Sequence, residues 1–248
     1  MKSPLLSARD VCVTFGGVKA ADRVSVDVHA DELLAIIGPN GSGKTTFLNL
    51  CTGYIRPQSG TVNLEGRDIT GLSPRAVTRL GVARAFQIPQ LFTEHRLIEN
   101  AMLAIAARRG FWTAVQPLER AGHRDEALAI LDLLGLSPAA DRFPPELPEG
   151  MRKLADIALA LALKPKLLLL DEPTSGVSAA EKFVLMNTLT AVLREQTITT
   201  VFVEHDMDLV RNYANRVLVW DHGHVIASGP PAEVLRDARV LQNVVGVA

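Results

Sequence analysis

The chain has 248 residues, of which 48% are hydrophobic and 21% are charged, so it can bury the core of one domain and has room for a subdomain. Its formal net charge of -1 leaves no basic footprint of the kind that nucleic-acid-binding proteins carry. The two cysteines, Cys12 and Cys51, form no disulfide framework and are typical of a reducing compartment, although a single bridge between them stays open.

Apolar segments in this chain are too short to cross a bilayer. Residues 157–163 and 167–170 are the longest, and Lys164-Pro165-Lys166 separates them, so neither reaches the ~20 residues that a spanning helix needs. Residues 1–4 lack the apolar core of a signal peptide. We therefore expect a chain that is soluble by itself and reaches a membrane only through a partner.

The first part of the chain has the alternating pattern of antiparallel strands. Residues 5–37 alternate apolar and polar positions, with a turn predicted at Gly16-Gly17. Phe15 ends the first strand beside that turn, and it is either a core aromatic or a platform on which a base stacks. Residues 60–66 predict a further strand, and Ser73-Pro74 predicts the start of a helix.

The second part predicts a parallel sheet interrupted by helices. Residues 80–87 predict a strand. Residues 88–164 are helical in pattern, with proline-rich joints near Pro117 and at residues 144–148, and we interpret them as an inserted helical subdomain. The unbroken apolar run before Asp171 is typical of a strand buried on both faces. A helix (179–194), a strand (199–205) and a hairpin (217–229) follow, which completes an α/β sheet.

Residues 38–45 fit the pattern G-x-x-x-x-G-K-[ST], whose backbone N–H groups wrap the phosphates of a nucleotide. An apolar strand (33–37) precedes the loop and a helix follows it, so the helix N-terminus favours an anion. This context disfavours a plain glycine-rich turn with a surface lysine. The predicted phosphate-binding residues are Gly38, Pro39, Asn40, Gly41, Ser42, Gly43, Lys44 and Thr45. Lys44 is expected to reach the β- and γ-phosphates, and the Thr45 hydroxyl to bind Mg²⁺.

Nucleotide hydrolysis needs further groups, and polar residues at two strand ends supply them. Asp171 follows four leucines and is placed to hold Mg²⁺, directly or through water. Glu172 beside it is the candidate general base that polarises the attacking water. His205 ends another strand and is placed to contact the γ-phosphate, although a lone histidine is more often structural.

Taken together, the chain resembles an ATP-binding subunit of an ABC transporter over nearly all its length. The matching motifs, in order, are Walker A (Gly38–Thr45), the Q-loop glutamine (Gln87), Walker B with its glutamate (Leu167–Glu172) and the switch histidine (His205). The resemblance implies one domain over residues 1–248, with a core of 1–87 and 165–248 and a helical subdomain near 88–164. The implied fold is a P-loop α/β fold with a mainly parallel core sheet, an antiparallel β subdomain and that insertion.

The resemblance also assigns roles to single residues. Phe15 matches the aromatic residue that stacks on adenine, and Thr46 matches a residue near the α-phosphate. Gln87 matches the glutamine that links Mg²⁺ to the helical subdomain, and it stands with Glu172 and His205 among the implied catalytic residues. The expected ligands are therefore ATP and Mg²⁺.

Finer details are similar to one branch, the ATPases of branched-chain and hydrophobic amino-acid uptake systems. The stretches that carry this similarity are 53–57, 83–92 and 204–210, together with 216–221. The implied partners are transmembrane permease subunits, a second ATPase subunit and, indirectly, a periplasmic binding protein. The implied location is the cytoplasmic face of the inner membrane, with no role for nucleic acid.

Two loops depart from the family pattern. At the signature loop, usually Leu-Ser-Gly-Gly-Gln, the chain has Leu147-Pro148-Glu149-Gly150-Met151, and the next loop has Ser178 where aspartate is common. Pro148 removes a hydroxyl and a backbone N–H, and Glu149 places a carboxylate where the family loop meets the partner's γ-phosphate. We expect Arg152 and Lys153 to offset part of that charge. The hypothesis that follows is a heterodimer with unequal sites, since a homodimer would make both sites weak.

The sequence thus predicts an ATP-hydrolysing subunit of an importer. Three alternatives stay open: an ABC ATPase for another cargo such as lipopolysaccharide export, an ABC protein that acts without a membrane partner, and a regulatory ATP-binding partner with low turnover.

Overall fold

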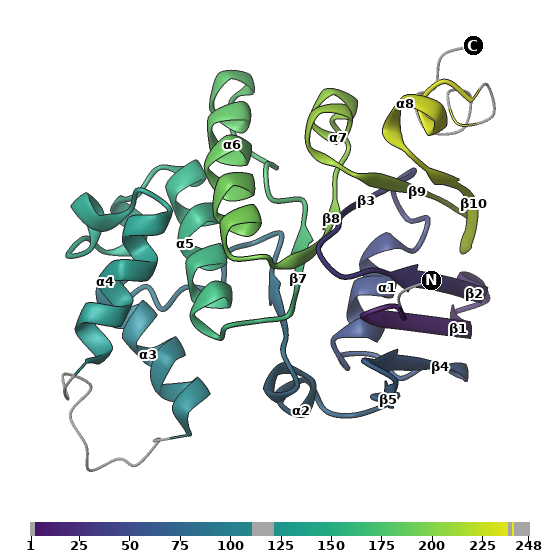
Figure 1. Ribbon diagram of the computed structural model, residues 1–248, viewed down its shortest axis with the longest axis horizontal. Helices are drawn as coiled ribbons and strands as arrows, with labels where there is room; N and C mark the ends of the chain where they lie inside the picture. Colours follow the sequence, from purple (N-terminus) through teal and green to yellow (C-terminus); the bar gives the residue numbers. More distant parts are fainter. Residues whose placement is uncertain (1–2, 111–121, 238–239, 241–248) are drawn as a thin grey trace.

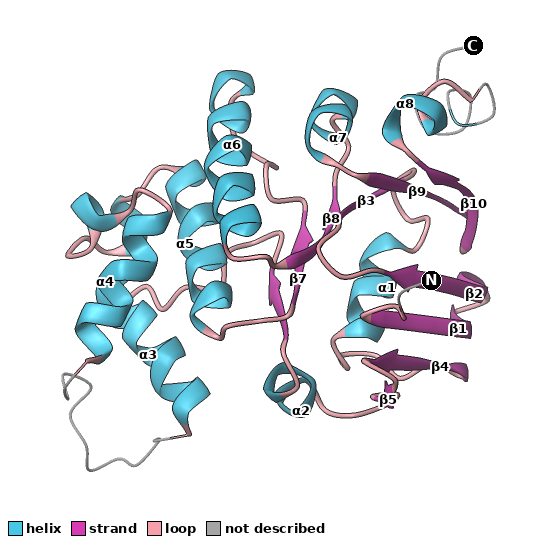
Figure 2. Ribbon diagram, viewed as in Figure 1, coloured by secondary structure: helices cyan, strands magenta, loops and turns pink. Residues whose placement is uncertain are grey.

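The computed structural model describes residues 3–110, 122–237 and 240, and within them two β-sheets are flanked by helices (Figures 1 and 2). The predicted joint near Pro117 lies outside the described residues. In the described part of the chain, no helix is both long enough and apolar enough to cross a bilayer. Cys12 and Cys51 are both free, so the single bridge that the sequence left open does not form.

The smaller sheet is antiparallel, as the alternating pattern predicts. Its strand order is β2-β1-β4-β5. The bounds are Leu6–Phe15 for β1, Val18–Val28 for β2, Ser59–Leu64 for β4 and Arg67–Asp68 for β5. The hairpin between β1 and β2 turns at Gly16 and Gly17, whose φ angles of 51° and 88° suit the two-residue turns that match strand twist.

The larger sheet has the order β10-β9-β3-β8-β7-β6, and every neighbouring pair is parallel except β9 and β10. The bounds are Leu33–Ile37 for β3, Val82–Ala85 for β6, Leu167–Asp171 for β7, Thr199–Val203 for β8, Arg216–Asp221 for β9 and His224–Gly229 for β10. Every residue of β3, β7 and β8 is buried, which agrees with the mainly apolar sequences of these three strands.

Helices divide the interior into two cores. One core lies between the two sheets and includes α1 (Lys44–Cys51). The other covers the opposite face of the large sheet, where α6 (Ala179–Glu195) and α7 (Met207–Tyr213) lie. The helices α3 (Leu97–Arg109), α4 (His123–Leu133) and α5 (Glu149–Ala162) extend this second core. Two further helices, α2 (Pro74–Arg79) and α8 (Pro231–Val234), and the single 3-10 turns at Ser137–Ala139 and Pro144–Glu146 complete the described elements.

Strands β6, β7 and β8 end one or two residues earlier than the strands that the sequence predicts at 80–87, 166–172 and 199–205. The strand predicted at 80–87 stops at Ala85, because the N–H groups of Phe86 and Gln90 donate to the two carboxylate oxygens of Asp156 on α5, each at 2.9 Å. Strand β7 stops at Asp171 because Glu172 has a φ of 50° and leaves the extended conformation. As a result, polar side chains gather in loops at the carboxyl edge of the sheet.

Candidate functional site

The loop Gly38–Thr45 joins β3 to α1 and packs closely against its surroundings. A Cβ at Gly38 would lie 2.0 Å from the carbonyl oxygen of Trp220, and one at Gly43 would lie 2.0 Å from that of Ala20. Gly43 also has a φ of 116°, a conformation that side chains disfavour. Both glycines are therefore required by the local geometry of the loop, and not only by a ligand.

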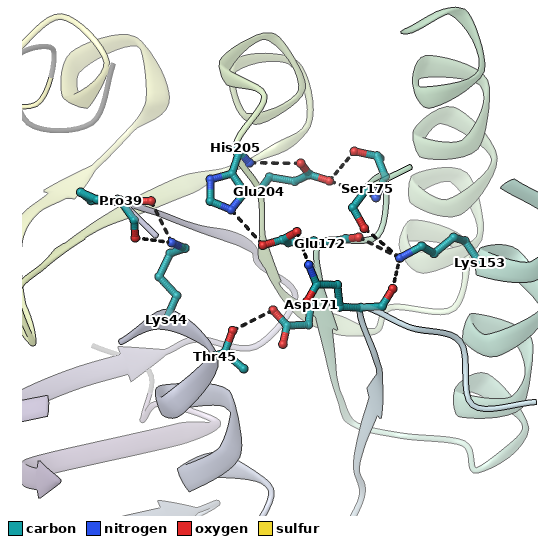
Figure 3. A network of polar contacts seen from close by, with 12 residues as sticks. Pro39, Lys44, Thr45, Lys153, Asp171, Glu172, Ser175, Glu204 and His205 are labelled. Atoms are coloured by element: carbon teal, nitrogen blue, oxygen red, sulfur yellow. Dashed lines mark hydrogen bonds and ion pairs between the residues drawn. The ribbon is translucent and has the colours of Figure 1, made fainter. Parts of the chain in front are cut away.

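Lys44 is almost buried within this loop, with 6% of its surface exposed. Its ammonium group donates to the carbonyl oxygens of Gly38 and Pro39, both at 2.8 Å (Figure 3). Burial lowers the pKa of Lys44, while the charges of Glu172 and Asp171 act in the opposite direction. The Ser42 hydroxyl is buried nearby without a hydrogen-bond partner among the described residues, so the loop holds a polar group that an incoming anion would satisfy.

Asp171 connects the phosphate loop to β6. Its Oδ1 accepts a hydrogen bond from the Thr45 hydroxyl at 3.3 Å, and its Oδ2 forms an ion pair with Arg84 at 2.6 Å. The side chains of Arg84 and Asp171 are each 5% exposed. Arg84 also donates to the side chain of Asn49 on α1 and lies over the ring of Phe86, 4.8 Å from its centroid.

The sequence reasoning did not identify Arg84 as a site residue. The available clue in the sequence was an arginine inside a short, otherwise apolar strand of a buried parallel sheet. A charge at such a position needs a partner.

The structure brings Gln87, Glu172 and His205 together. The Glu172 carboxylate accepts a hydrogen bond from the Gln87 amide at 2.8 Å and lies 2.9 Å from Nε2 of His205 (Figure 3). Its φ of 50° is an uncommon conformation for a residue with a side chain, and it costs about 1–3 kcal/mol where the surroundings enforce it. Such conformations are found frequently at functional sites.

Lys153 on α5 is a second contact that sequence reasoning missed. Its side chain is buried, with 2% of the residue exposed, and the ammonium donates to the carbonyl oxygen of Gln87. It also donates to the carbonyl oxygen of Glu172 at 3.3 Å and to the Ser175 hydroxyl at 3.0 Å (Figure 3). The sequence suggested only that Lys153 offsets the charge of Glu149. The structure shows that Lys153 also points inward, where it joins two loops, the one after β6 and the one after β7.

Glu204, next to His205, holds the loop that follows Walker B. It is 4% exposed and accepts hydrogen bonds from the backbone N–H and the hydroxyl of Thr174, at 3.2 and 2.7 Å. Burial raises the pKa of Glu204, and these hydrogen bonds limit the rise. The buried acid therefore fixes the position of two neighbouring loops.

Two predicted nucleotide-contacting residues lie at the edges of this network. Phe15 is 50% exposed at the end of β1, so it is not the core aromatic that the sequence left open. Thr46 lies in the first turn of α1 and is partly buried. Within the described part of the chain, the Thr46 side chain forms no hydrogen bond with the carboxylates of Asp171 and Glu172.

The signature-position residues begin α5. Leu147 is buried, Pro148 caps the helix, and the acidic side chain of Glu149 lies in its first turn. Arg152 donates through two nitrogens to Glu149, which agrees with the expected charge offset. The residues that depart from the family pattern therefore place an ion pair, between Glu149 and Arg152, in the first turn of α5.

The sequence pattern of the family described as ABC transporter matches residues 21–175, which is more than half of the chain. The chain belongs to the ABC transporter family. Over its full length, this ABC subunit is 32% identical to the high-affinity branched-chain amino acid transport ATP-binding protein LivG of Salmonella typhimurium, and 100% of both chains is covered.

Solved structures agree with this assignment. The ATP-binding cassette MJ1267 of an ABC transporter matches with a TM-score of 0.89 and 32% identity over 100% of both chains. The cassette MJ0796, in a dimeric structure bound to ADP and Pi, matches with a TM-score of 0.77 and 25% identity over 91% of this chain and 98% of that one. The predicted family and fold are thereby confirmed.

Membership also fixes the general activity. ABC ATP-binding subunits bind and hydrolyse ATP to power transport, act with transmembrane permease subunits and dimerise, as MJ0796 does. This chain is therefore an ATP-binding, ATP-hydrolysing subunit of an ABC transporter.

Proposed function

We propose that Gly38–Thr45, with Thr46 and Phe15, binds ATP in this chain. The support is geometric: the glycines allow close approach, and Lys44 points at loop carbonyls that a phosphate would replace. The Ser42 hydroxyl has no hydrogen-bond partner in the part of the chain that the structure describes. Phe15 is exposed enough to stack on a base.

The oxygen atoms of Thr45 and Asp171 suit Mg²⁺, which prefers hard oxygen ligands. Gln87, whose side-chain amide donates to Glu172, the residue after Asp171, is the third proposed ligand residue. Bound Mg²⁺ would supply positive charge to neutralise the β- and γ-phosphates. Asp171 would then exchange part of its contact with Thr45 for the ion, while Arg84 keeps the carboxylate in place.

We propose that Glu172 is the general base and His205 its companion at the γ-phosphate. The observation that carries this proposal is the carboxylate of Glu172 held between Gln87 and His205 at 2.8 and 2.9 Å. A carboxylate oriented on both sides can accept a proton from water without first reorganising. His205 is 42% exposed in its side chain, so it is open to a phosphate from solvent or from a partner face.

For the cargo, we propose branched-chain or related amino acids, imported through a permease pair supplied by a periplasmic binding protein. The support is the full-length similarity to LivG, a branched-chain amino acid transport protein. In this assignment residues 1–248 form one domain at the cytoplasmic face of the membrane, with α3, α4 and α5 within the inserted helical subdomain of about residues 88–164.

We further propose a heterodimer with a second ATPase subunit. Pro148 provides no N–H at the start of α5, and Glu149 is held there by Arg152, so this chain offers a poor signature loop to a partner's phosphates. Its own Walker residues would be completed by a normal signature loop from the second subunit. The site that contains Leu147–Met151 would bind ATP and turn it over slowly.

The test is the substitution Glu172→Gln in the assembled transporter, with Glu195→Gln, an exposed glutamate at the end of α6, as the control. We expect Glu172→Gln to lower hydrolysis at least about a hundredfold and to retain ATP on the purified complex, because the general base is lost while binding groups remain. Undiminished hydrolysis would contradict the role of Glu172. Uptake of labelled leucine by membrane vesicles that contain the complex tests the cargo separately.

A further inference from the structure

A cavity of about 1050 Å³ lies at the amino-terminal ends of β6 and β7, whereas the proposed ATP site lies at the carboxyl ends of the strands. Its lining includes Gly81 and Lys166, which precede β6 and β7, whereas Asp171 is the last residue of β7 and Glu172 follows it at the other end. Residues of β5 and α2 and residues at the end of α3 line the cavity, so it is formed by two parts of the chain. Figure 2 shows the positions of these elements. None of the residues proposed above to bind or hydrolyse ATP lines this cavity.

The lining is strongly basic for a chain whose formal net charge is -1. Its six cationic residues are Arg67, Arg75, Arg79, Arg108, Lys164 and Lys166. One carboxylate, that of Glu65, lies among them and is paired with Lys166 at 2.6 Å. The formal charge of the lining is therefore +5, which concentrates positive potential in a concave surface.

Three of these cations have no partner among the residues that the structure describes. Glu126, outside the lining, pairs with Arg108 at 2.8 Å and with Lys164 at 3.2 Å. The side chains of Arg67, Arg75 and Arg79 form neither a hydrogen bond nor an ion pair with any residue that the structure describes. Arg75 and Arg79 are four positions apart on α2, so they lie on one face of that helix, where two like charges repel each other. A bound anion would relieve that repulsion.

We propose that this cavity binds a phosphate-bearing ligand that also has an apolar part. Guanidinium groups match phosphate oxygens in pairs of parallel hydrogen bonds, which explains three unpaired arginines in one lining. The volume is at the upper limit of small-molecule sites and far larger than a single phosphate needs. Leu64, Leu80 and Leu163 line the same cavity and would contact the apolar part.

The experiment is calorimetric titration of the full chain with geranyl diphosphate, in the presence of saturating ADP and Mg²⁺ so that the phosphate loop is occupied. We expect binding that Arg75→Gln with Arg79→Gln weakens at least about tenfold, because two charge-assisted contacts are lost. The matched control is Arg194→Gln with Arg211→Gln, which removes the same charge from exposed positions on α6 and α7 and should leave binding unchanged.

A second arm distinguishes a soluble ligand from a lipid headgroup. Vesicles of equal parts phosphatidylcholine and phosphatidylglycerol replace geranyl diphosphate, with pure phosphatidylcholine as the comparison. Binding to the mixed vesicles that is weakened by Arg75→Gln with Arg79→Gln would identify a lipid headgroup as the ligand. Binding to geranyl diphosphate without binding to the vesicles would identify a soluble ligand. If the double variant fails to fold, Arg67→Gln on β5 takes its place. Equal binding by the cavity variant and the matched control, or no binding in either arm, would overturn the proposal.

Discussion

Two buried cations, Arg84 and Lys153, contact the acidic residues that follow the apolar part of β7. Arg84 pairs with the carboxylate of Asp171, and Lys153 donates to the backbone of Glu172. Neither cation contacts the phosphate loop in the described network. Their contribution is therefore to hold the carboxylates in position, and this makes their effects separable from nucleotide binding.

Replacing Arg84 tests the first of these contacts. In Arg84→Met the carboxylate of Asp171 keeps its burial and loses its 2.6 Å partner, so we expect the free energy of unfolding to fall by about 3–5 kcal/mol. Arg84→Lys retains the charge without the planar guanidinium that also reaches Asn49. Its free energy of unfolding should therefore lie between those of the native chain and Arg84→Met. Urea unfolding measures both. Arg194→Met, at an exposed position, should change stability by less than about 0.5 kcal/mol. A loss of stability there as large as in Arg84→Met would show that the loss does not come from the ion pair with Asp171.

Lys153 is predicted to affect turnover and not ATP affinity. Lys153→Met leaves the carbonyl oxygens of Gln87 and Glu172 without their shared donor, so the Glu172 side chain is held less firmly. Because small displacements of reacting groups reduce rates strongly, we expect kcat of the assembled transporter to fall about tenfold to a hundredfold with KM for ATP nearly unchanged. Lys153→Arg should recover part of the rate. A rise in KM with an unchanged kcat would assign Lys153 to binding instead.

The contrast between predicted and missed residues has a physical origin. The phosphate loop is a local pattern, in which eight successive residues and the flanking strand and helix carry the whole signal. Arg84 and Lys153 act through partners that lie 87 and 66 positions away along the chain, and only packing brings these together. The same applies to the early end of β6, which depends on a carboxylate 70 residues further on. Buried charges inside an apolar strand or helix were the available clue.

At the scale of elements, helix α5 connects the helical part of the chain to the loop after β6. Asp156 accepts the N–H groups of Phe86 and Gln90, and Lys153, one turn earlier, donates to the carbonyl of Gln87. A positive and a negative side chain of one helix therefore bind the backbone of one loop. Movement of α5 must carry the loop that contains Gln87, and with it a hydrogen bond to Glu172.

The titration of Asp156 gives a testable prediction for its contact with the backbone N–H groups of Phe86 and Gln90. Burial raises the pKa of Asp156 above its ordinary value of 3.8, and the two backbone hydrogen bonds limit the rise. An acid whose pKa is higher in the folded state takes up its proton there first, so folding becomes more favourable as the pH falls from the raised pKa towards 3.8. Asp156→Asn cannot titrate. Over that interval, the stability of the native chain relative to Asp156→Asn should therefore increase as the pH falls.

Urea unfolding of both proteins at a series of pH values tests this. At neutral pH, Asp156→Asn should already be destabilised by about 1–3 kcal/mol, since one of the two loop N–H groups then faces an amide NH₂. A difference in stability that stays constant with pH would show that Asp156 does not titrate in the folded chain over this range. A difference that shrinks on acidification would give the opposite sign and contradict the assigned direction.

At the scale of the whole molecule, the chain contains a complete set of Walker residues and an altered signature loop. Asp171, Glu172 and His205 form one connected network with the phosphate loop. The start of α5, by contrast, has Pro148 without an N–H and Glu149 paired to Arg152. In the proposed dimer the two halves combine across the interface, so we expect the turnover of this chain to depend on which chain lies opposite.

Repairing the signature loop tests that dependence. We expect the purified chain alone to hydrolyse ATP slowly, and the variant Pro148→Ser with Glu149→Gly and Met151→Gln to hydrolyse it at least about tenfold faster, because a phosphate then gains N–H and hydroxyl donors and loses a nearby carboxylate. Adding Glu172→Gln to the repaired chain should abolish the gain, which assigns it to this site and not to a contaminant. In a complex with an intact second ATPase, the same repair should change the rate much less, since one competent site already exists there. A native chain that turns over rapidly by itself, or a repair without effect, would mean that Leu147–Met151 already serves as a working loop.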